Sequence, residues 1–383
     1  MQKIIDLSHS MKKSYLYLCF FLLLVACNST KSDKNAQTVP TTVFTQAKGL
    51  VITPHDGYTE VAIKNPWKEG STLQTYILVP SNSSVPQNLP KGAVIRTPLT
   101  NALVYSSVHA NAIKELGQLS SVKGVCDAQY FTMPEITEGV NNGTISNVGS
   151  SMSPITEKII ALSPDAIILS PYQNAGYDEL ARLGIPIIQC ADYMEASPLG
   201  RAEWIKLFGL LYEEVDKADS IYNCVVKSYN ELKQLAVTAS ANPKILSENI
   251  INGTWYVPGG DSYMAQLFND AGGFYAWNDV HSTGSIPLDM PRVLEKAHDA
   301  DIWLIKSFDS EFSYTKLKSQ NPLNAEFKAF KEQKIYFCDT ERTTLFQDFP
   351  FHPELLLKEY IAIFHPQLLP EYSLQYFKPL INE

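Results

Sequence analysis

The sequence is poor in the residues that build metal centres and disulfide frameworks. It holds 6 cysteines in 383 residues, and no two of them are spaced as Cys-x-x-Cys. Four of them, Cys126, Cys190, Cys224 and Cys338, are scattered, and most of these lie in apolar runs, where plain burial is the expected environment. The 7 histidines are scattered as well. The sequence therefore indicates no zinc or redox motif, and we predict no metal site of the protein's own.

Positive charge is also scarce. The 31 lysine and arginine residues are outnumbered by 40 aspartate and glutamate residues, which gives a formal net charge of −9, and they form no basic cluster. Nucleic acids bind to basic surfaces. The composition therefore argues against a nucleic-acid partner.

Motifs of common enzyme classes are missing. The sequence contains no P-loop, no G-x-G-x-x-G and no H-E-x-x-H. The serines that follow glycines in VGSSMS and GGDS (259–262) do not match G-x-S-x-G. We predict that the chain is not an enzyme.

An apolar run near the N-terminus is typical of an export signal. Two lysines precede apolar residues 15–26, a run too short to span a bilayer comfortably. It ends in Leu-Val-Ala before Cys27, which is similar to a bacterial lipobox. We expect residues 1–26 to be a signal peptide, with either Met1 or Met11 as the start. Lipidation of Cys27 would anchor the protein to a membrane of the periplasm or cell envelope; an uncleaved signal anchor is the alternative.

Two further segments precede the main folded part. Residues 27–48 are small and polar and lack apolar periodicity, which predicts a flexible tether. Strand-like pieces separated by turns follow over residues 50–80. They predict a short antiparallel extension at the edge of the first domain.

From residue 93 the pattern becomes an alternation of strands and helices. Residues 153–164 predict a helix with Ser153 as its N-cap and Pro154 at its first position. A buried strand over 165–170 follows, and a helix is expected over 196–215. Such alternation predicts a mostly parallel sheet with helices on both faces.

Residues 215–239 predict the helix around which the chain is organised. Their apolar positions step by three and four, and no glycine or proline interrupts them. At 1.5 Å per residue the helix would be roughly 37 Å long, which suits a strut between two bodies. An ordinary long core helix is the alternative.

Similar sequence lies on both sides of this helix. Residues 157–169 align with 291–304, because each is a short helix that runs through an Asp-Ala pair into a buried strand. Each also follows a loop rich in glycine and serine. Unless this likeness of α/β units is accidental, it predicts two similar α/β lobes, residues 49–214 and 240–383, bridged by the long rigid helix.

The order and spacing of these segments resemble the metal-chelate class of substrate-binding proteins, which serve bacterial ABC importers for siderophores, haem and cobalamin. The resemblance covers about residues 93–365 and is carried by NVG…SPITEKIIALSPDAIILS, LARLGIPII, the long helix, WYVPGGDSYMAQLFNDAGG and DADIWLI. It implies two lobes bridged by one helix, with the ligand in the cleft between them. It also implies modest closure on binding.

The function that this resemblance implies is transport. A lipid-anchored solute-binding protein would capture an iron chelate (siderophore or haem) or cobalamin and deliver it to the permease of an ABC importer. No cofactor is implied, because a metal would arrive as part of the chelate that is the ligand. The alternative is a tetrapyrrole chelatase-like enzyme or another anchored binding protein of the same fold; the lipid anchor argues against a chelatase.

A bulky ligand needs flat apolar faces and a few polar anchors, from loops at the carboxyl ends of strands. The candidates are Tyr105, Ser151, Tyr172 and Gln173 in the first lobe, and Trp255, Tyr256, Trp277, Arg342 and Phe346 in the second, with Phe308 as a further one. Tyr105 and Tyr172 each follow an apolar strand directly. Core packing is the alternative for every aromatic. Arg342 would pair with an anionic ligand group, or else form a surface salt bridge.

The resemblance also implies one exposed acidic residue per lobe for docking to the permease. Glu157 lies where the first belongs, but Pro291 occupies the equivalent second position. We therefore assign the second role to Glu295, with Asp289 as the alternative. For each of these, a solvated helix face is the rival interpretation.

The identity of the ligand stays open at this stage. Haem would need an axial tyrosine or histidine, for which Tyr105, Tyr172, His109 and His281 are available. Loops within residues 146–174 contain no tryptophan, although a corrin ring would be expected to stack there.

Overall fold

The computed structural model describes residues 43–382. The predicted signal peptide, Cys27 and the first part of the predicted tether lie outside the described residues. Among the residues that are described, no helix combines the length and the apolar character that a membrane crossing requires.

The chain first forms a four-stranded sheet. Its order is β1 (Leu50–His55), β2 (Tyr58–Lys64), β3 (Thr72–Pro80) and β4 (Ala93–Thr97). The first three strands are antiparallel, as predicted, whereas β4 pairs parallel to β3. Asp56-Gly57 makes the two-residue turn between β1 and β2, and Gly57 has a φ of +80° that favours glycine. Leu50, Val61 and Ile63 are buried on the inner face.

The first lobe is built on a parallel sheet of order β11-β10-β5-β6-β7. Its strands are β5 (Ala102–Val104), β6 (Val122–Val125), β7 (Ser146–Asn147), β10 (Ala166–Leu169) and β11 (Ile187–Gln189). Its helices are α2 (Ser107–Glu115), α3 (Pro134–Asn142), α4 (Thr156–Leu162) and α5 (Asp178–Ala181). Neighbouring residues of β10 join different apolar clusters, Ile167 in one and Ile168 in the other. Both faces of the sheet are therefore buried, as the alternation predicted.

Two local predictions in this lobe are wrong. Ser153 and Pro154 form strand β9, which pairs with β8 (Gly149–Ser150), so they do not open a helix. Helix α4 begins at Thr156, and its N-cap is Ile155. The single helix expected over 196–215 is instead divided into α6 (Pro198–Ala202), capped by the Ser197 side chain, and α7 (Ile205–Leu211).

The second lobe repeats the design. Its main sheet has the order β15-β12-β17-β18-β19, with β19 antiparallel to β18. These strands are β12 (Lys244–Ser247), β15 (Phe274–Tyr275), β17 (Ile302–Ser307), β18 (Ile335–Asp339) and β19 (Lys378–Pro379). A smaller antiparallel sheet contains β13 (Ile250–Ile251), β14 (Thr254–Pro258) and β16 (Ser285–Leu288). The helices are α9 (Tyr263–Asp270), α10 (Met290–Ala297), α11 (Tyr314–Gln320), α12 (Lys328–Lys331), α13 (Leu345–Asp348) and α14 (Pro353–Phe364).

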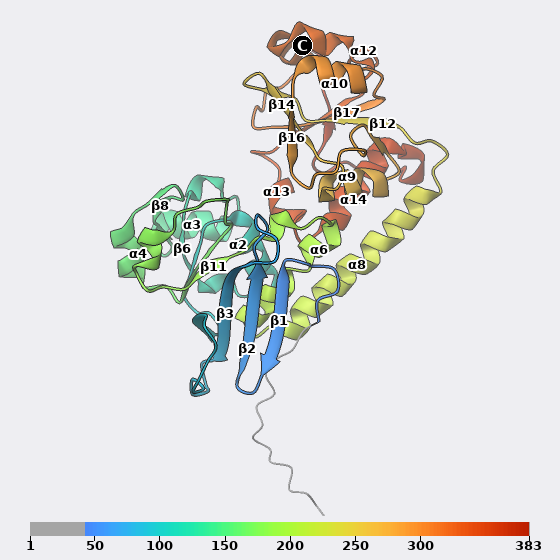
Figure 1. Ribbon diagram of the computed structural model, residues 1–383. Helices are drawn as coiled ribbons and strands as arrows, with labels where there is room; N and C mark the ends of the chain where they lie inside the picture. Colours follow the sequence, from blue (N-terminus) through green and yellow to red (C-terminus); the bar gives the residue numbers. More distant parts are fainter. Residues whose placement is uncertain (1–42, 383) are drawn as a thin grey trace, which may run out of the picture. The chain divides into compact units, whose positions relative to one another are not determined.

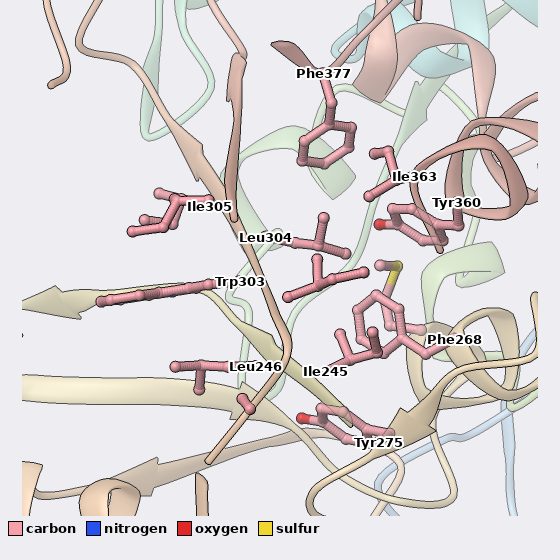
Figure 2. Packing of buried hydrophobic residues seen from close by; sticks show 14 of the residues in the cluster. Ile245, Leu246, Phe268, Tyr275, Trp303, Leu304, Ile305, Tyr360, Ile363 and Phe377 are labelled. Carbon is pink, nitrogen blue, oxygen red and sulfur yellow. The ribbon is translucent and has the colours of Figure 1, made fainter. Parts of the chain in front are cut away.

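Strand β17 forms the centre of this second core. Figure 2 shows Trp303 and Ile305 on one side of the strand and Leu304 on the other, towards Tyr360. All four side chains are almost fully buried. Alternate residues thus pack against both faces, which explains why the strand reads as one continuous apolar run.

Helix α8 (Val215–Val237) joins the two lobes as one continuous helix of 23 residues (Figure 1). Val215, Ala218, Tyr222 and Val225 belong to the apolar core of the first lobe. Tyr229 and Ala236 of the same helix belong to the core of the second lobe. The helix packs against α7 at one end and against α14 at the other. The predicted bridging helix is confirmed.

Direct contacts also join the lobes beside α8. The Arg201 guanidinium on α6 pairs with Asp192 at 3.1 Å and lies 5.1 Å and 5.0 Å from the rings of Tyr263 and Phe349 in the second lobe. His352, just before α14, contacts Glu115 on α2 through Nε2 at 2.8 Å. Its Nδ1 contacts Glu354 at 2.8 Å.

A buried carboxylate clasps the start of the described chain. Glu203 is fully buried, and its side chain accepts hydrogen bonds from the backbone N–H groups of Thr45, Gln46 and Ala47. Lys206 pairs with Glu203 at 3.2 Å and donates to the Val43 carbonyl. Residues 43–48, which the sequence assigned to a flexible tether, are therefore held against α6 and α7.

We expect Glu203→Gln to lower the free energy of unfolding by about 3 kcal/mol, because it removes the buried carboxylate next to the Lys206 ammonium, which then keeps only the more exposed Asp219 at 3.4 Å. Amide exchange at residues 45–47 should accelerate together with this loss. Chemical denaturation and hydrogen exchange measure the two effects. Glu231→Gln on the exposed face of α8 is the matched control, and we expect it to change stability by less than about 0.5 kcal/mol. Equal effects of the two substitutions would contradict the clasp.

The His352 contact should make stability depend on pH. Burial lowers the pKa of His352, but hydrogen bonds with Glu115 and Glu354 raise it by more, to about 10. In the unfolded chain its pKa is about 6.5. Protonation therefore stabilises the folded state fully below about pH 6.5, and this contribution is lost as the pH rises to about 10. The difference in unfolding free energy between wild type and His352→Gln should shrink from about pH 6 to about pH 10.5; a constant difference would refute this assignment.

Candidate functional site

Three cavities adjoin one another around Phe346, two of them lined by residues of both lobes, and we call them together the interlobe cleft. Their volumes are about 470, 850 and 500 Å³. Phe346, the second residue of α13, lines all three. The first is bordered by Tyr193 of the first lobe and the third by Tyr130, while the rest of their lining comes largely from the second lobe. The cavities therefore share one aromatic side chain. The 470 and 500 Å³ cavities combine residues of both lobes, whereas the 850 Å³ cavity is lined by the second lobe alone.

Aromatic side chains are left exposed in this cleft. Tyr256 is 50% exposed, Phe308 66%, Phe346 41% and Tyr130 63%. Exposed aromatics that gather in one place mark a binding surface. They offer the flat apolar faces that a bulky ring or chelate requires.

A partly buried ion pair lies in the cleft. Glu248 follows β12 and Lys306 lies near the end of β17, so both are at the carboxyl edge of the second sheet. Their side chains form an ion pair and line two of the cavities. The Trp303 indole N–H donates to the Glu248 carbonyl at 2.7 Å, which holds this backbone in a left-handed conformation with a φ of +65°. Asn249, next in the chain, is buried and also lines both cavities.

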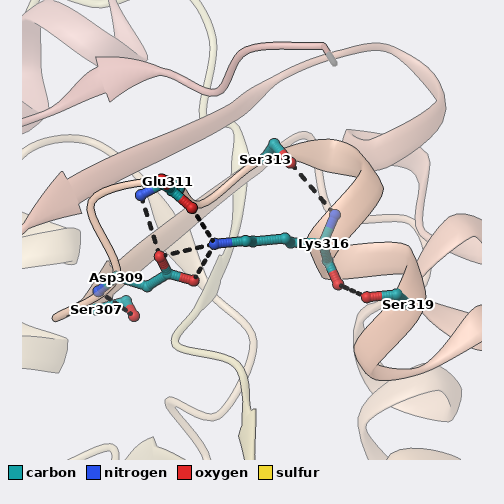
Figure 3. Close-up of polar contacts among 6 residues, drawn as sticks. All are labelled: Ser307, Asp309, Glu311, Ser313, Lys316 and Ser319. Carbon is teal, nitrogen blue, oxygen red and sulfur yellow. Dashed lines mark hydrogen bonds and ion pairs between the residues drawn. The ribbon is translucent and has the colours of Figure 1, made fainter.

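A hydrogen-bonded loop positions Phe308. Asp309 accepts two bonds from the Lys316 ammonium, both at 3.0 Å, and one from the Glu311 backbone N–H (Figure 3). The bond from Lys316 lowers the pKa of Asp309. Ser307 accepts a bond from the Asp309 N–H at 3.2 Å. Because the loop is tied on both sides of Phe308, this ring is kept at the cleft although two thirds of it is exposed.

In the first lobe the predicted residues lie near the carboxyl edge of the sheet but do not line the cleft cavities. Tyr105 packs against the smaller apolar cluster, and burial raises its pKa. The Ser151 backbone N–H donates to Asp127 at 3.0 Å; burial raises the Asp127 pKa, and hydrogen bonds with Ser151, Ser150 and Gln129 together lower it by more. Tyr172 is 50% exposed, with its ring edge-to-face with Tyr177, and Gln173 is exposed.

In the second lobe the predicted residues separate into two groups. Tyr256 and Phe346 line the cleft, as does Phe308. Trp255 and Trp277 are buried in the core, where Trp255 stacks on Trp303 at 5.4 Å between ring centroids. For these two tryptophans the structure shows the packing alternative. Alternate residues of β14 face opposite ways, and Trp255 takes the inward position. Trp277 follows β15 and packs against Tyr275, with 5.7 Å between ring centroids.

Arg342 also departs from its predicted position. Its side chain is 72% exposed, lies 3.7 Å from Asp339 and lines none of the cleft cavities. The surface salt bridge that the sequence left as an alternative is thus what the structure shows.

Several cleft residues were not among the predicted ones. Tyr130 lies in a short 3-10 helix (Ala128–Tyr130) after β6, and Glu248, Asn249 and Lys306 lie at strand ends. Their positions after apolar strands were a usable signal. Polar residues at strand ends are common, however, and nothing in the sequence showed that Glu248 and Lys306 pair.

The two histidines considered as haem ligands are engaged elsewhere. His109 is fully buried, with Nε2 3.2 Å from Asp192. His281 is on the surface, 3.3 Å from Asp261. Within residues 43–382 no group of three or more histidine, cysteine or acidic side chains could hold a metal ion.

The predicted docking residues are both exposed. Glu157 lies in the first turn of α4, beside the exposed side chains of Ile155 and Ile160. Glu295 is exposed on α10. Asp289 caps that helix, because its carboxylate accepts a bond from the Arg292 N–H at 3.1 Å.

The sequence and fold are similar to those of known proteins. An uncharacterized lipoprotein of Methanocaldococcus jannaschii is 30% identical over 338 residues, which cover 82% of this chain and 77% of that protein. The periplasmic haem-binding protein HutB of Vibrio cholerae has the same fold, with a TM-score of 0.57, 17% identity and coverage of 70% of this chain and 99% of that one. An ABC-type Fe3+-hydroxamate transport protein of Saccharomonospora viridis gives a TM-score of 0.55 at 18% identity, with coverage of 70% and 94%.

The match to a family model agrees with these likenesses. Residues 122–341 match the model described as periplasmic binding protein, and this region contains the greater part of both lobes and the whole of α8. The chain therefore belongs to the periplasmic binding protein family.

Proposed function

We propose that this protein is a lipid-anchored solute-binding protein that captures an iron chelate (siderophore or haem) or cobalamin in the interlobe cleft and delivers it to an ABC importer. The observation that carries the proposal is the set of exposed aromatics in the cleft, Tyr130 from the first lobe and Tyr256, Phe308 and Phe346 from the second. Aromatic side chains that stay exposed in an open cleft contribute little to core packing, so contact with a ligand explains them better.

Charge in the cleft supports a ligand with polar groups around an apolar body. Glu248 and Lys306 neutralise one another when the cleft is empty. A ligand that offers an acceptor to Lys306 and a donor to Glu248 would replace that pair without leaving either charge unpaired. Siderophores carry groups of both kinds at their periphery, and the propionates of haem supply the acceptor for Lys306.

Neighbouring proteins of this fold support the same class of ligand. HutB is a haem-binding protein, and the protein of Saccharomonospora viridis belongs to an Fe3+-hydroxamate transport system. The relative in Methanocaldococcus jannaschii is a lipoprotein, which supports the predicted anchor at Cys27. Glu157 and Glu295 are the proposed contacts with the permease, since an exposed carboxylate can meet a basic pocket of the partner.

Visible absorbance of the protein purified from its native host tests the class of ligand. A Soret band would indicate haem, a corrin spectrum would indicate cobalamin, and a broad visible band would indicate a ferric siderophore. Addition of the identified compound should raise the melting temperature without any turnover. Conversion of the compound into a product would overturn the proposal in favour of a chelatase-like enzyme.

We expect Phe346→Ala to weaken chelate binding about 10-fold to 100-fold, because this ring lines all three cavities and rings at the centre of a site contribute most. Titration calorimetry with the identified chelate measures the change. Phe274→Ala is the matched control, since Phe274 is 47% exposed on β15 but lines none of the cleft cavities. An unchanged affinity in Phe346→Ala would contradict the assignment of the cleft.

Docking can be separated from binding. We expect Glu157→Arg to leave chelate affinity unchanged and to abolish chelate-dependent growth of the host, because the reversed charge would repel a basic pocket on the permease. Growth on the chelate as sole iron source measures this. Glu179→Arg, at another exposed position of the first lobe, should support normal growth. Equal growth of both variants would exclude Glu157 from the docking surface.

A further inference from the structure

A fourth cavity of about 550 Å³ lies beside the interlobe cleft. Its walls come from the outer face of the β1–β2 hairpin, from the β2–β3 turn, from residues 191–196 and from Thr283 of the second lobe. Val51 and Ala62, which pair across the hairpin, form part of its surface. We call it the extension cavity.

The extension cavity adjoins the cleft. Met194 and Thr283 line both it and the 470 Å³ cleft cavity. Met194 belongs to the first lobe and Thr283 to the second, and only these two residues are shared. A methionine side chain is flexible and can adapt its shape. A movement of the Met194 side chain would therefore let an arm of a ligand in the cleft reach the extension cavity.

The lining of this cavity differs in kind from that of the cleft. It contains no aromatic side chain, and its apolar part consists of small or aliphatic groups: Val51, Ala62, Pro66, Ala191, Met194 and Ala196. Such a surface suits a narrow aliphatic chain better than a flat ring.

The charges around the cavity favour an anion. Lys48 and Lys64 are exposed in its lining, and neither ammonium forms an ion pair with any described residue. Of the two acidic residues in the lining, Glu195 is buried and accepts bonds from the backbone N–H groups of Lys48 and Gly49 and from the Trp204 indole. Glu69 is exposed. The two ammonium groups are thus available to a ligand, while one of the two carboxylates is already satisfied.

We propose that the extension cavity is an accessory compartment for a flexible aliphatic arm that ends in a carboxylate and belongs to the chelate held in the cleft. This inference rests on the proposed function, and it names the part of the ligand that the extension would recognise. The hairpin that forms the outer wall lies before residues 122–341, the part that matches the family model. The outer wall of the compartment therefore lies outside the matched region, whereas its inner wall, which includes Met194 and Thr283, lies within it.

The compartment can be tested without any chelate, with decanoate as the probe. We expect decanoate to bind to the full chain in titration calorimetry, Ala62→Trp to weaken it at least 10-fold by filling the cavity, and Lys64→Glu to weaken it at least 5-fold. Thr53→Trp on β1, exposed but outside the cavity lining, should bind as the wild type does. Decylamine should bind more weakly than decanoate. Absence of binding to the wild type, or binding that neither Ala62→Trp nor Lys64→Glu weakens, would overturn the proposal.

A pair of chelates then tests the link to the cleft. Ferrioxamine B ends in an amine, whereas its N-succinyl derivative carries a carboxylate on the same ferric hydroxamate. The succinyl form should bind at least 5-fold more tightly to the wild type, and Ala62→Trp should abolish that difference. A difference that persists in Ala62→Trp would overturn the link. If decanoate binds as expected and neither these nor other chelates bind, the proposed function fails and the compartment stands. If chelates bind but decanoate does not, the compartment fails alone.

Discussion

Helix α8 packs into two separate apolar cores, and this packing limits how the two lobes can move relative to one another. Its first half contributes Val215, Tyr222 and other residues to one core, and its second half contributes Tyr229 and Ala236 to the other. A bend within the helix would break consecutive backbone hydrogen bonds, and a rotation would remove side chains from one core or both. The lobes therefore cannot separate by a hinge in this segment. Motion has to occur in the contacts beside the helix, which is why closure on the ligand should be modest.

Those contacts are charged groups packed against rings and carboxylates. Arg201 is held by Asp192 of its own lobe and faces Tyr263 and Phe349 of the other. A guanidinium can slide over a ring face with less loss of energy than a directional hydrogen bond would suffer. His352 is different, because its bonds with Glu115 and Glu354 fix both ring nitrogens. The lobes are thus joined by an adaptable contact of Arg201 close to the cleft and by a directional contact of His352 with Glu115 on α2. The first allows small movements between the lobes, and the second keeps the lobes aligned.

Elements with a regular apolar period could be predicted from the sequence. Predictions failed where the environment of a residue depends on contacts with other segments of the chain. The three-and-four spacing was enough for α8, because a helix of that length has few alternatives. Trp255 and Tyr256 are neighbours on β14, and only the phase of the strand decides which one is buried; one apolar pattern fits both phases. Ser153 was expected to cap a helix, but its backbone pairs with Ser150 in a hairpin. The clasp of residues 45–47 by Glu203 joins segments more than 150 residues apart, and no local signal announces it.

Two buried carboxylates, those of Glu203 and Glu195, hold the N-terminal segment and connect it with the extension cavity. Glu203 and Glu195 together bind five consecutive backbone N–H groups, those of residues 45–49, and the chain enters β1 directly afterwards. Without that clasp the β1–β2 hairpin would keep only its pairing with β3 and its inner apolar face as attachments to the lobe, and its outer face would be less firmly placed beside Met194. Glu195 also lines the extension cavity. Its carboxylate therefore helps to position the wall of the cavity, and because it is already hydrogen-bonded to backbone N–H groups it forms no ion pair with Lys48 or Lys64. The anion selectivity of the compartment therefore follows from how the extension is held.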